Sequence, residues 1–374
     1  GVNAGNSIES GGNYNTVVGD EAGTAITTGD SNTLVGFQSG DALTDGKNNT
    51  AIGQDALGSD TLGKASVAIG RAALGVQNFT SETNAYNTAV GNSAGAAVTT
   101  GVQNTLIGSL AGDAITTGNN NATLGYLSLS ANTTGANNVA LGASTLSSNT
   151  TGSSNTAAGH GSLNANTTAD NNTAVGYFAL IANTTGAGNS ALGKSAMAAN
   201  TTGSNNTAVG HGALDANTTA DNNVAVGFNS LGANTTGSQN IAVGIQSLLT
   251  NTTGSYNTAL GTNALLANTT ASNNTAMGAN ALVANTTGAS NTSVGSGTLL
   301  SNTTASNNTA MGLNTLYTNT TGADNTSIGF ASTYYNTTGA NNTALGSLAL
   351  QTNTTASNNT AVGQVALTAN TTGA

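Results

Sequence analysis

Few side chains in this sequence could take part in acid–base or metal chemistry. Its 374 residues include two His, 14 Asp and Glu, four Lys and Arg, and no Cys. Without Cys there is neither a disulfide nor a thiolate zinc site. His160 and His211 are too far apart to share a metal, and ten of the acids lie before residue 114 without the regular spacing of calcium-binding loops. We therefore expect no catalytic residue, no metal site and no cofactor, with a solvated acidic region near the N-terminus.

Charge and hydropathy exclude two classes of partner. The formal net charge is −10, and an acidic chain repels phosphate backbones and anionic lipid surfaces. No apolar run approaches the length of about 20 residues that a membrane-spanning helix needs. We expect no nucleic-acid partner and no membrane insertion by this segment.

A 17-residue repeat organises nearly the whole chain. The Gly of an NTAVG-like motif, which we call position 0, occurs in 21 copies with one four-residue insertion between Gly70 and Gly91. Position −4 is Asn in 20 copies, position −1 is a large aliphatic residue in 20, with Ala158 as the exception, and position −2 is Ala in 15. Residues 1–14 lead into the repeats, and residues 15–374 are predicted to form a single array. The position-0 residues are Gly19, Gly36, Gly53 and Gly70, then Gly91 and every 17th residue through Gly363.

The repeat predicts an all-β parallel solenoid, or β-roll, of about 21 coils. Seventeen residues are too few for two helices and a turn, and the Gly, Asn and Thr content disfavours helix. Each strand would pair with its equivalent in the next coil about 4.8 Å away, giving a rod of roughly 100 Å. Alternation puts Thr173 and Val175 on one strand face and Ala174 and Gly176 on the other. We expect the aliphatic columns inside and the narrow Ala/Gly face open to a neighbouring chain.

Two positions of the repeat exchange large side chains in a way that indicates a shared interior. Where position +4 is Gly, as in Gly23 and Gly40, position +7 is aliphatic, as in Ile26 and Leu43. Elsewhere position +4 is usually Leu and position +7 is usually Asn. One large apolar group would thus fill one space from either position. Since each coil buries only about two large side chains, worth roughly 3 to 6 kcal/mol, we expect several chains to pack together.

The Asn columns are predicted to be structural. Position −4, from Asn15 through Asn359, is expected to form a ladder of side-chain amides between coils. The 15 NTT triplets from Asn132 through Asn370 are also formal N-glycosylation sequons. Their perfect register favours a structural role, with glycan attachment as the alternative.

Bulky residues at irregular positions are the candidates for partner binding, because recognition residues usually lie where a rigid scaffold varies. Phe79 and Tyr86 lie in the insertion, while Tyr334 and Tyr335 follow a Thr that replaces the usual Leu. We predict partner contacts for these four, and packing against a neighbouring chain is the alternative. Aromatic residues also occupy position +1 at Phe37, Tyr126, Tyr177, Phe228 and Phe330.

The units NTAVG at 172–176, SVAIG at 66–70 and NVAVG at 223–227 resemble the head repeats of trimeric autotransporter adhesins. In that family such repeats form a left-handed parallel β-roll in which three chains pack into an adhesive head. Similar NTAVG and ANTTG arrays look like those of bacteriophage tail fibres and of bacterial surface fibre proteins that end in a self-cleaving chaperone domain. The resemblance covers essentially residues 15–374 and implies a homotrimer. Head repeats in that family are typically shorter than 17 residues, and this sequence contains no coiled-coil stalk, membrane-anchor barrel or chaperone domain.

These observations predict a structural, non-enzymatic extracellular fibre or adhesin segment on a cell surface or virion. It would act as a rigid trimeric spacer and a multivalent attachment surface for an unidentified receptor or glycan. The alternative is a monomeric ice- or surface-binding solenoid that uses ranked Thr such as Thr184 and Thr201. Adjacent Thr in NTT point to opposite sides, which leaves one rank where a flat site needs two. Glycan cleavage is disfavoured because no paired carboxylates mark a fixed cleft.

Overall fold

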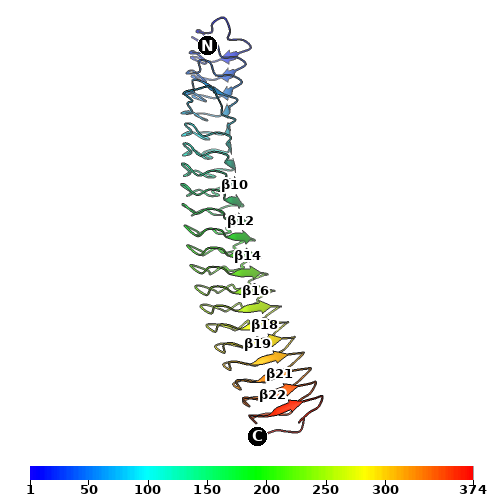
Figure 1. Cartoon of the computed structure of the whole chain (residues 1–374). Helices are drawn as coiled ribbons and strands as arrows, with labels where there is room; N and C mark the ends of the chain where they lie inside the picture. Colours follow the sequence, from blue (N-terminus) through cyan, green and yellow to red (C-terminus); the bar gives the residue numbers. More distant parts are fainter. Residues whose placement is uncertain (374) are drawn as a thin grey trace. The chain divides into compact units, whose positions relative to one another are not determined.

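The computed structural model describes residues 1–373 and contains two compact units, Gly1–Gly188 and Asn189–Ala374. Each unit is a stack of parallel β-coils, and no helix occurs among the described residues (Figure 1). The chain makes about 20 turns, and equivalent strand residues are 17 apart wherever the repeat is uninterrupted. The all-β parallel solenoid predicted from the repeat is therefore confirmed, while its continuity as one array from 15 to 374 stays a prediction.

In Gly1–Gly188, most coils contribute one three-residue strand. The strands are β1 (Thr16–Val18), β2 (Thr33–Val35), β3 (Thr50–Ile52), β4 (Gly63–Lys64), β5 (Val67–Ile69), β6 (Thr83–Asn84), β7 (Thr88–Val90), β8 (Thr105–Ile107), β9 (Ala122–Leu124), β10 (Val139–Leu141), β11 (Thr156–Ala158) and β12 (Thr173–Val175). Strands β4 and β6 form a separate two-stranded parallel pair beside the insertion.

Asn189–Ala374 is more regular, with one strand per coil. The strands are β13 (Ser190–Leu192), β14 (Thr207–Val209), β15 (Val224–Val226), β16 (Ile241–Val243), β17 (Thr258–Leu260), β18 (Thr275–Met277), β19 (Thr292–Val294), β20 (Thr309–Met311), β21 (Thr326–Ile328), β22 (Thr343–Leu345) and β23 (Thr360–Val362).

The strand faces point the opposite way from our prediction. The alternation is as expected, but Ala174 at position −2 is fully buried while Thr173 and Val175 lie outside. The interior is too narrow for a second aliphatic column, because Ala from the strand already shares it with Leu180 at position +4. Each regular coil thus buries one large side chain, and the Ala column is not available to a neighbouring chain.

The exchange between positions +4 and +7 is confirmed. Ile26, Leu43, Val98 and Ile115 are all fully buried. A Cβ on Gly40 would lie 3.0 Å from Cδ1 of Leu43 and 2.7 Å from Cδ2 of Leu34. Leu34 itself replaces the usual Ala at position −2. Gly at position +4 therefore leaves room for large side chains from positions −2 and +7.

Backbone conformation explains why position +4 is Gly in some coils and Leu in most others. Gly40 has φ +57°, and Leu180 adopts nearly the same left-handed conformation, with φ 51°. That conformation costs an L residue roughly 1–2 kcal/mol, whereas burying a Leu side chain gains about 1.5–3 kcal/mol. Burial therefore offsets the strain, and glycine is favoured wherever another residue fills the space.

Position 0 requires glycine for two independent reasons. Gly210 has φ +135°, a conformation that residues with a side chain rarely adopt. A Cβ there would also lie 2.5 Å from the carbonyl oxygen of Gly227 in the next coil. The close backbone approach between coils explains why this glycine occurs in every copy.

Two ladders of buried Asn hold successive coils together, which confirms the predicted position −4 ladder. The backbone N–H of Asn138 donates to Oδ1 of Asn121 at 3.1 Å. A second ladder runs through the NTT triplets, where Nδ2 of Asn149 donates to Oδ1 of Asn132 at 2.9 Å. The ladders converge because Nδ2 of Asn138 and Nδ2 of Asn149 both donate to the carbonyl of Gly152.

The second ladder also decides between the two interpretations of the sequons. Asn149 is fully buried, and the nitrogen that would carry a glycan donates two hydrogen bonds inside the coil. N-glycosylation of the folded chain at such a position would break both bonds. The structural interpretation of the NTT triplets is supported.

The N-terminal segment stacks on the first coil. The N–H groups of Gly5 and Glu9 donate to the carbonyls of Ala22 and Thr27, each at 3.0 Å.

Residues 1–373 contain no helix with the length and apolarity needed to cross a membrane.

Candidate contact surfaces

The outer side of the strands forms the most extensive candidate surface. We call the residues at positions −3 and −1 of all copies the Thr–aliphatic face; Thr173 and Val175 are one example. Neither column contains a charged residue in any copy. Several of the aliphatic side chains are about half exposed, including Leu124 at 53% and Leu192 at 51%. Contiguous exposed apolar side chains of this kind mark interaction surfaces.

The Thr hydroxyls of this face are available to a partner. In the uninterrupted strands of residues 1–373, hydroxyls such as those of Thr173 and Thr258 have no hydrogen bond within the chain. In the NTT turns, by contrast, Oγ1 of Thr133 donates to the carbonyl of Thr150 at 3.1 Å. The first Thr of each triplet is therefore used to link coils, while the strand Thr faces outward.

The four predicted partner-binding residues differ in accessibility. Phe79 is only 5% exposed, so its ring offers no contact surface and belongs to the interior of the insertion. Tyr86 is 56% exposed. Tyr335 is 49% exposed and packs edge-on against Tyr334, with ring centroids 4.7 Å apart. Tyr334 is half-buried because its ring stacks on Tyr317 at 4.9 Å.

The coil of Tyr334 and Tyr335 has an unusual polar interior. Thr333 is buried at position +4, where Leu is usual, and Ser327 replaces Ala at position −2. Oγ of Ser327 lies 2.9 Å from both Oγ1 of Thr333 and Oγ of Ser332. This hydroxyl cluster satisfies the polar groups that replace the missing Leu.

Asp60, in the coil before the insertion, is a buried carboxylate, which corrects the expectation that the acids near the N-terminus are all solvated. Asp60 and Gln77 both occupy position +7 and are fully buried. Oδ1 of Asp60 accepts from the N–H of Gly63 at 3.0 Å, and Oδ2 accepts from Nε2 of Gln77 at 2.7 Å. Burial raises the pKa of Asp60 above its ordinary value, although the hydrogen bonds from Gln77, Gly63 and Phe79 oppose the shift.

Gln77 also repairs the one break in the position −4 ladder. Ser66 is the only residue of that column that is not Asn. Nε2 of Gln77 donates to Oγ of Ser66 at 3.0 Å, and Oε1 of Gln77 accepts from Nδ2 of Asn87 at 2.8 Å. Loss of one amide in one column is thus compensated by a longer amide in another.

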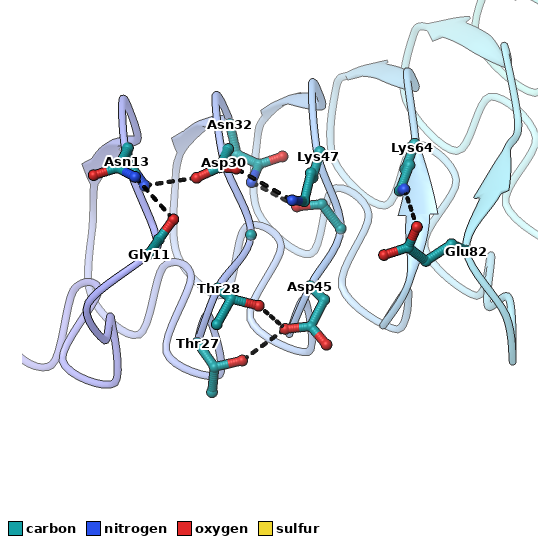
Figure 2. Close-up of polar contacts among 12 residues, drawn as sticks. Gly11, Asn13, Thr27, Thr28, Asp30, Asn32, Asp45, Lys47, Lys64 and Glu82 are labelled. Carbon is teal, nitrogen blue, oxygen red and sulfur yellow. Dashed lines mark hydrogen bonds and ion pairs between the residues drawn. The ribbon is translucent and has the colours of Figure 1, made fainter.

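Polar side chains also link the first coils at the surface, as Figure 2 shows. Nζ of Lys47 lies 3.2 Å from Oδ2 of Asp30, and Lys64 pairs with Glu82. The backbone hydrogen bond from Asn13, and then Lys47, hold the pKa of Asp30 below its ordinary value. Hydrogen bonding by Lys64 likewise lowers the pKa of Glu82. These contacts join adjacent coils and do not enclose a ligand.

A third ladder lies at position −6 and was not predicted. Asp30 accepts from the N–H of Asn13 at 2.8 Å, and Asp170 accepts from the N–H of Ser153 at 2.7 Å. Elsewhere Ser takes this role, as where Oγ of Ser306 accepts from the N–H of Ala289 at 3.0 Å. The recurrence of Asp, Asn and Ser at one position is the sequence signal for it.

Both His are exposed, and they contact aromatic rings. His160 stacks on Tyr177 at 5.7 Å, and His211 lies 5.5 Å from Phe228. Within residues 1–373 no three His, Asp or Glu side chains are grouped to hold a metal, and the surface has no pocket.

Each unit is a stack of coils whose outer strand face carries no charged residue, with a few exposed aromatic groups. Comparisons with protein-family models and with curated protein sequences find no match to this chain.

Proposed function

We propose that this chain is a structural, non-enzymatic segment of an extracellular fibre or adhesin, on a cell surface or a virion. Three parallel copies would pack as a rigid spacer and multivalent attachment surface. The resemblance to trimeric adhesin and tail-fibre repeats supports the trimer. The observation that carries the proposal is the Thr–aliphatic face, which repeats an apolar side chain on coil after coil without any charge.

The Thr–aliphatic face replaces the Ala/Gly face as the proposed contact between chains. The 11 strands of Asn189–Ala374, spaced about 4.8 Å apart and some 13–16 Å wide with the flanking residues, span roughly 700–850 Å², which a trimer would share between two neighbours. A standard interface buries about 800 Å² per partner. Burying this face would add the apolar contacts that one large buried side chain per coil leaves scarce.

Attachment to a receptor or glycan would use groups outside that face. Tyr86 and Tyr335 are the exposed aromatic candidates, with Tyr334 supporting Tyr335. Aromatic side chains combine a large apolar contact area with a polar tip. Three chains would present each group three times, so weak contacts would add through avidity.

Sedimentation equilibrium tests the trimer, with an expected mass of three chains. Ile328→Lys should dissociate it, because Ile328 is 39% exposed on the Thr–aliphatic face and the charge would be buried without a partner. Thr321→Lys, at an exposed turn position, is the control and should remain trimeric. A monomeric parent chain would contradict the trimer, and a trimer unaffected by Ile328→Lys would contradict the choice of face.

Ice or ordered-surface binding remains the second candidate, and one observation favours it. The NTT turns supply a single rank of Thr, whereas a flat binding site needs two ranks of side chains. The strands supply two, because a rank of Thr hydroxyls and a rank of aliphatic side chains run side by side on the same outer face. A monomeric chain with thermal hysteresis that is lost in Ile328→Lys would favour this function over the fibre.

A further inference from the structure

A repetitive interface leaves the alignment of its chains weakly specified. If one chain slides along another by a single coil, most of the Thr–aliphatic face meets identical residues again, because Thr and an apolar residue recur in these columns. Pairings with such a short period are prone to slippage unless some feature breaks the repetition. Assembly of a defined fibre therefore needs a marker on the face.

Within Asn189–Ala374, one pair of adjacent coils breaks the repetition most strongly. Here positions −3, −1 and +1 are all apolar, whereas position −3 is usually Thr and position +1 is usually polar or small. We call these six residues the register patch: Val224, Val226, Phe228, Ile241, Val243 and Ile245.

The register patch is contiguous and exposed. Strands β15 and β16 pair Val224 with Ile241 and Val226 with Val243. Phe228 is 45% exposed, Ile241 42% and Ile245 53%. The patch lies within Asn189–Ala374, on the Thr–aliphatic face and the column beside it.

A second apolar group makes the pattern along this unit non-periodic. Met311, Leu313, Ile328 and Phe330 are each at least 39% exposed, but Thr309 and Thr326 keep position −3 polar. This group is five coils from the register patch. A shift of two or three coils would therefore pair neither group with an apolar coil, and a shift of one or four coils would pair only one coil of each group with an apolar coil.

We propose that the register patch docks on the same patch of a second copy of this chain and thereby fixes the axial alignment of the subunits. This proposal rests on the proposed trimer, and it adds that the register patch selects one axial alignment of its subunits. A second copy fits because the patch is continuous with the uncharged face proposed to join the chains. Within Asn189–Ala374, only a copy in register places apolar residues opposite all three apolar columns of both coils, since a shifted copy sets Thr hydroxyls against at least one coil. Single distinctive side chains specify alignment in coiled coils in the same manner.

Disulfide trapping reads the alignment directly, because the chain has no Cys. Two tagged full-length chains, one with Leu260→Cys and one with Val294→Cys, are mixed by co-expression and oxidised. The two positions are two coils apart, about 9.6 Å, which exceeds the reach of a disulfide. The parent sequence should give same-position disulfides and almost no mixed ones.

The patch is tested by residues that other coils already carry. Phe228→Ser, Ile241→Thr and Ile245→Thr are introduced together, because Ser296, Thr258 and Thr262 occupy the equivalent positions. The variant should keep its chain count by sedimentation but lose alignment, with mixed disulfides becoming comparable to same-position ones. Ile241→Val with Ile245→Leu preserves the apolar surface and should retain the parental pattern.

Each outcome separates this proposal from the fibre itself. Mixed disulfides in the parent trimer, or same-position disulfides alone in the Ser/Thr variant, would overturn the register role and leave the trimer standing. A Ser/Thr variant that becomes monomeric would also overturn it, because the patch would then supply affinity in place of alignment. A monomeric parent chain would instead remove the proposed trimer.

Discussion

The coils of Asn189–Ala374 and the first coils of Gly1–Gly188 share one backbone and fill it differently. In the second unit, Leu214 and Asn217 represent the usual filling, a buried Leu beside a buried Asn ladder. In the first coils, Gly40 and Leu43 take the same two positions, and charged side chains link the coils outside. The fold therefore depends on the Gly at position 0 and on a filled interior. Whether the large side chain comes from position +4 or from position +7 matters less.

The two regions also differ in how a break is tolerated. Next to the insertion, Ser66 replaces the usual Asn, and Asp60 and Gln77 occupy a position where other coils carry Asn or an aliphatic residue. Every one of these changes has a partner within adjacent coils. Irregularity is thus compensated locally, while the neighbouring coils continue unchanged.

The largest effect is expected at the feature that both regions share. Gly36→Ala and Gly210→Ala should each destabilise the chain by about 3–5 kcal/mol, because φ is strained and the new Cβ meets the next coil's backbone. Gly212→Asn is the control: Gly212 has φ 64°, Asn229 occupies the same position in the next coil, and a Cβ on Gly212 would meet the flexible side chain of Asn229 and no backbone atom. Urea unfolding should show a loss below about 1 kcal/mol for that variant. If Gly212→Asn and Gly210→Ala lowered the free energy of unfolding equally, the close approach of position 0 to the next coil would not explain its glycine.

An exchange at the boundary between the two fillings tests whether they are interchangeable. Leu129→Gly alone should cost about 2–5 kcal/mol for the cavity, and Asn132→Leu alone should overpack the coil and remove the acceptor for Asn149. The double variant recreates the arrangement of Gly112 and Ile115 one coil earlier. It should recover at least about 1 kcal/mol relative to the sum of the single losses.

The coupling energy comes from a double-mutant cycle in urea. Additive losses would mean that positions +4 and +7 do not share a space, which would break the comparison between the two regions.

A smaller effect is expected from the buried carboxyl of Asp60, in the coil before the insertion. Since the pKa of Asp60 is higher in the folded chain than its ordinary 3.8, the folded state holds the proton more tightly. The stability that protonated Asp60 contributes is complete at pH values below 3.8, and it is lost as the pH rises through the raised pKa. Asp60→Asn should remove this part of the pH dependence.

The check is the difference in unfolding free energy between the parent and Asp60→Asn across pH 3 to 8 in about one-unit steps. Relative to the variant, the parent should lose stability as pH rises. A difference that stays flat would show that the carboxyl is not desolvated. Asp113, whose pKa is also raised by burial, remains in both proteins and cancels.

The sequence was sufficient for the solenoid because its signals are periodic. The Asn columns, the Gly column and the exchange of large side chains between positions +4 and +7 each imply stacked equivalents, and the structure confirms them. The orientation of the strand was predicted wrongly for a physical reason. A three-residue strand alternates equally well with Val175 inside or outside, and only the width of the coil, set by Leu180 at left-handed φ, selects Ala174 for the interior.

The candidate contact residues were harder to predict than the fold. Phe79 and Tyr86 are seven residues apart in one insertion, yet one is buried and the other exposed. That difference arises from where the insertion folds, with Asp60 binding the backbone of Gly63 and Phe79. No periodic signal encodes such contacts.

The central claim is that residues 17 apart lie side by side in adjacent coils. Leu192→Cys with Val209→Cys tests it directly, because these residues are register partners in β13 and β14 and paired strands lie within disulfide reach. We predict rapid oxidation to an intrachain disulfide, whereas Leu192→Cys with Thr202→Cys should remain reduced despite its shorter loop. Equal or faster oxidation of the 192–202 pair would contradict the stacked coils.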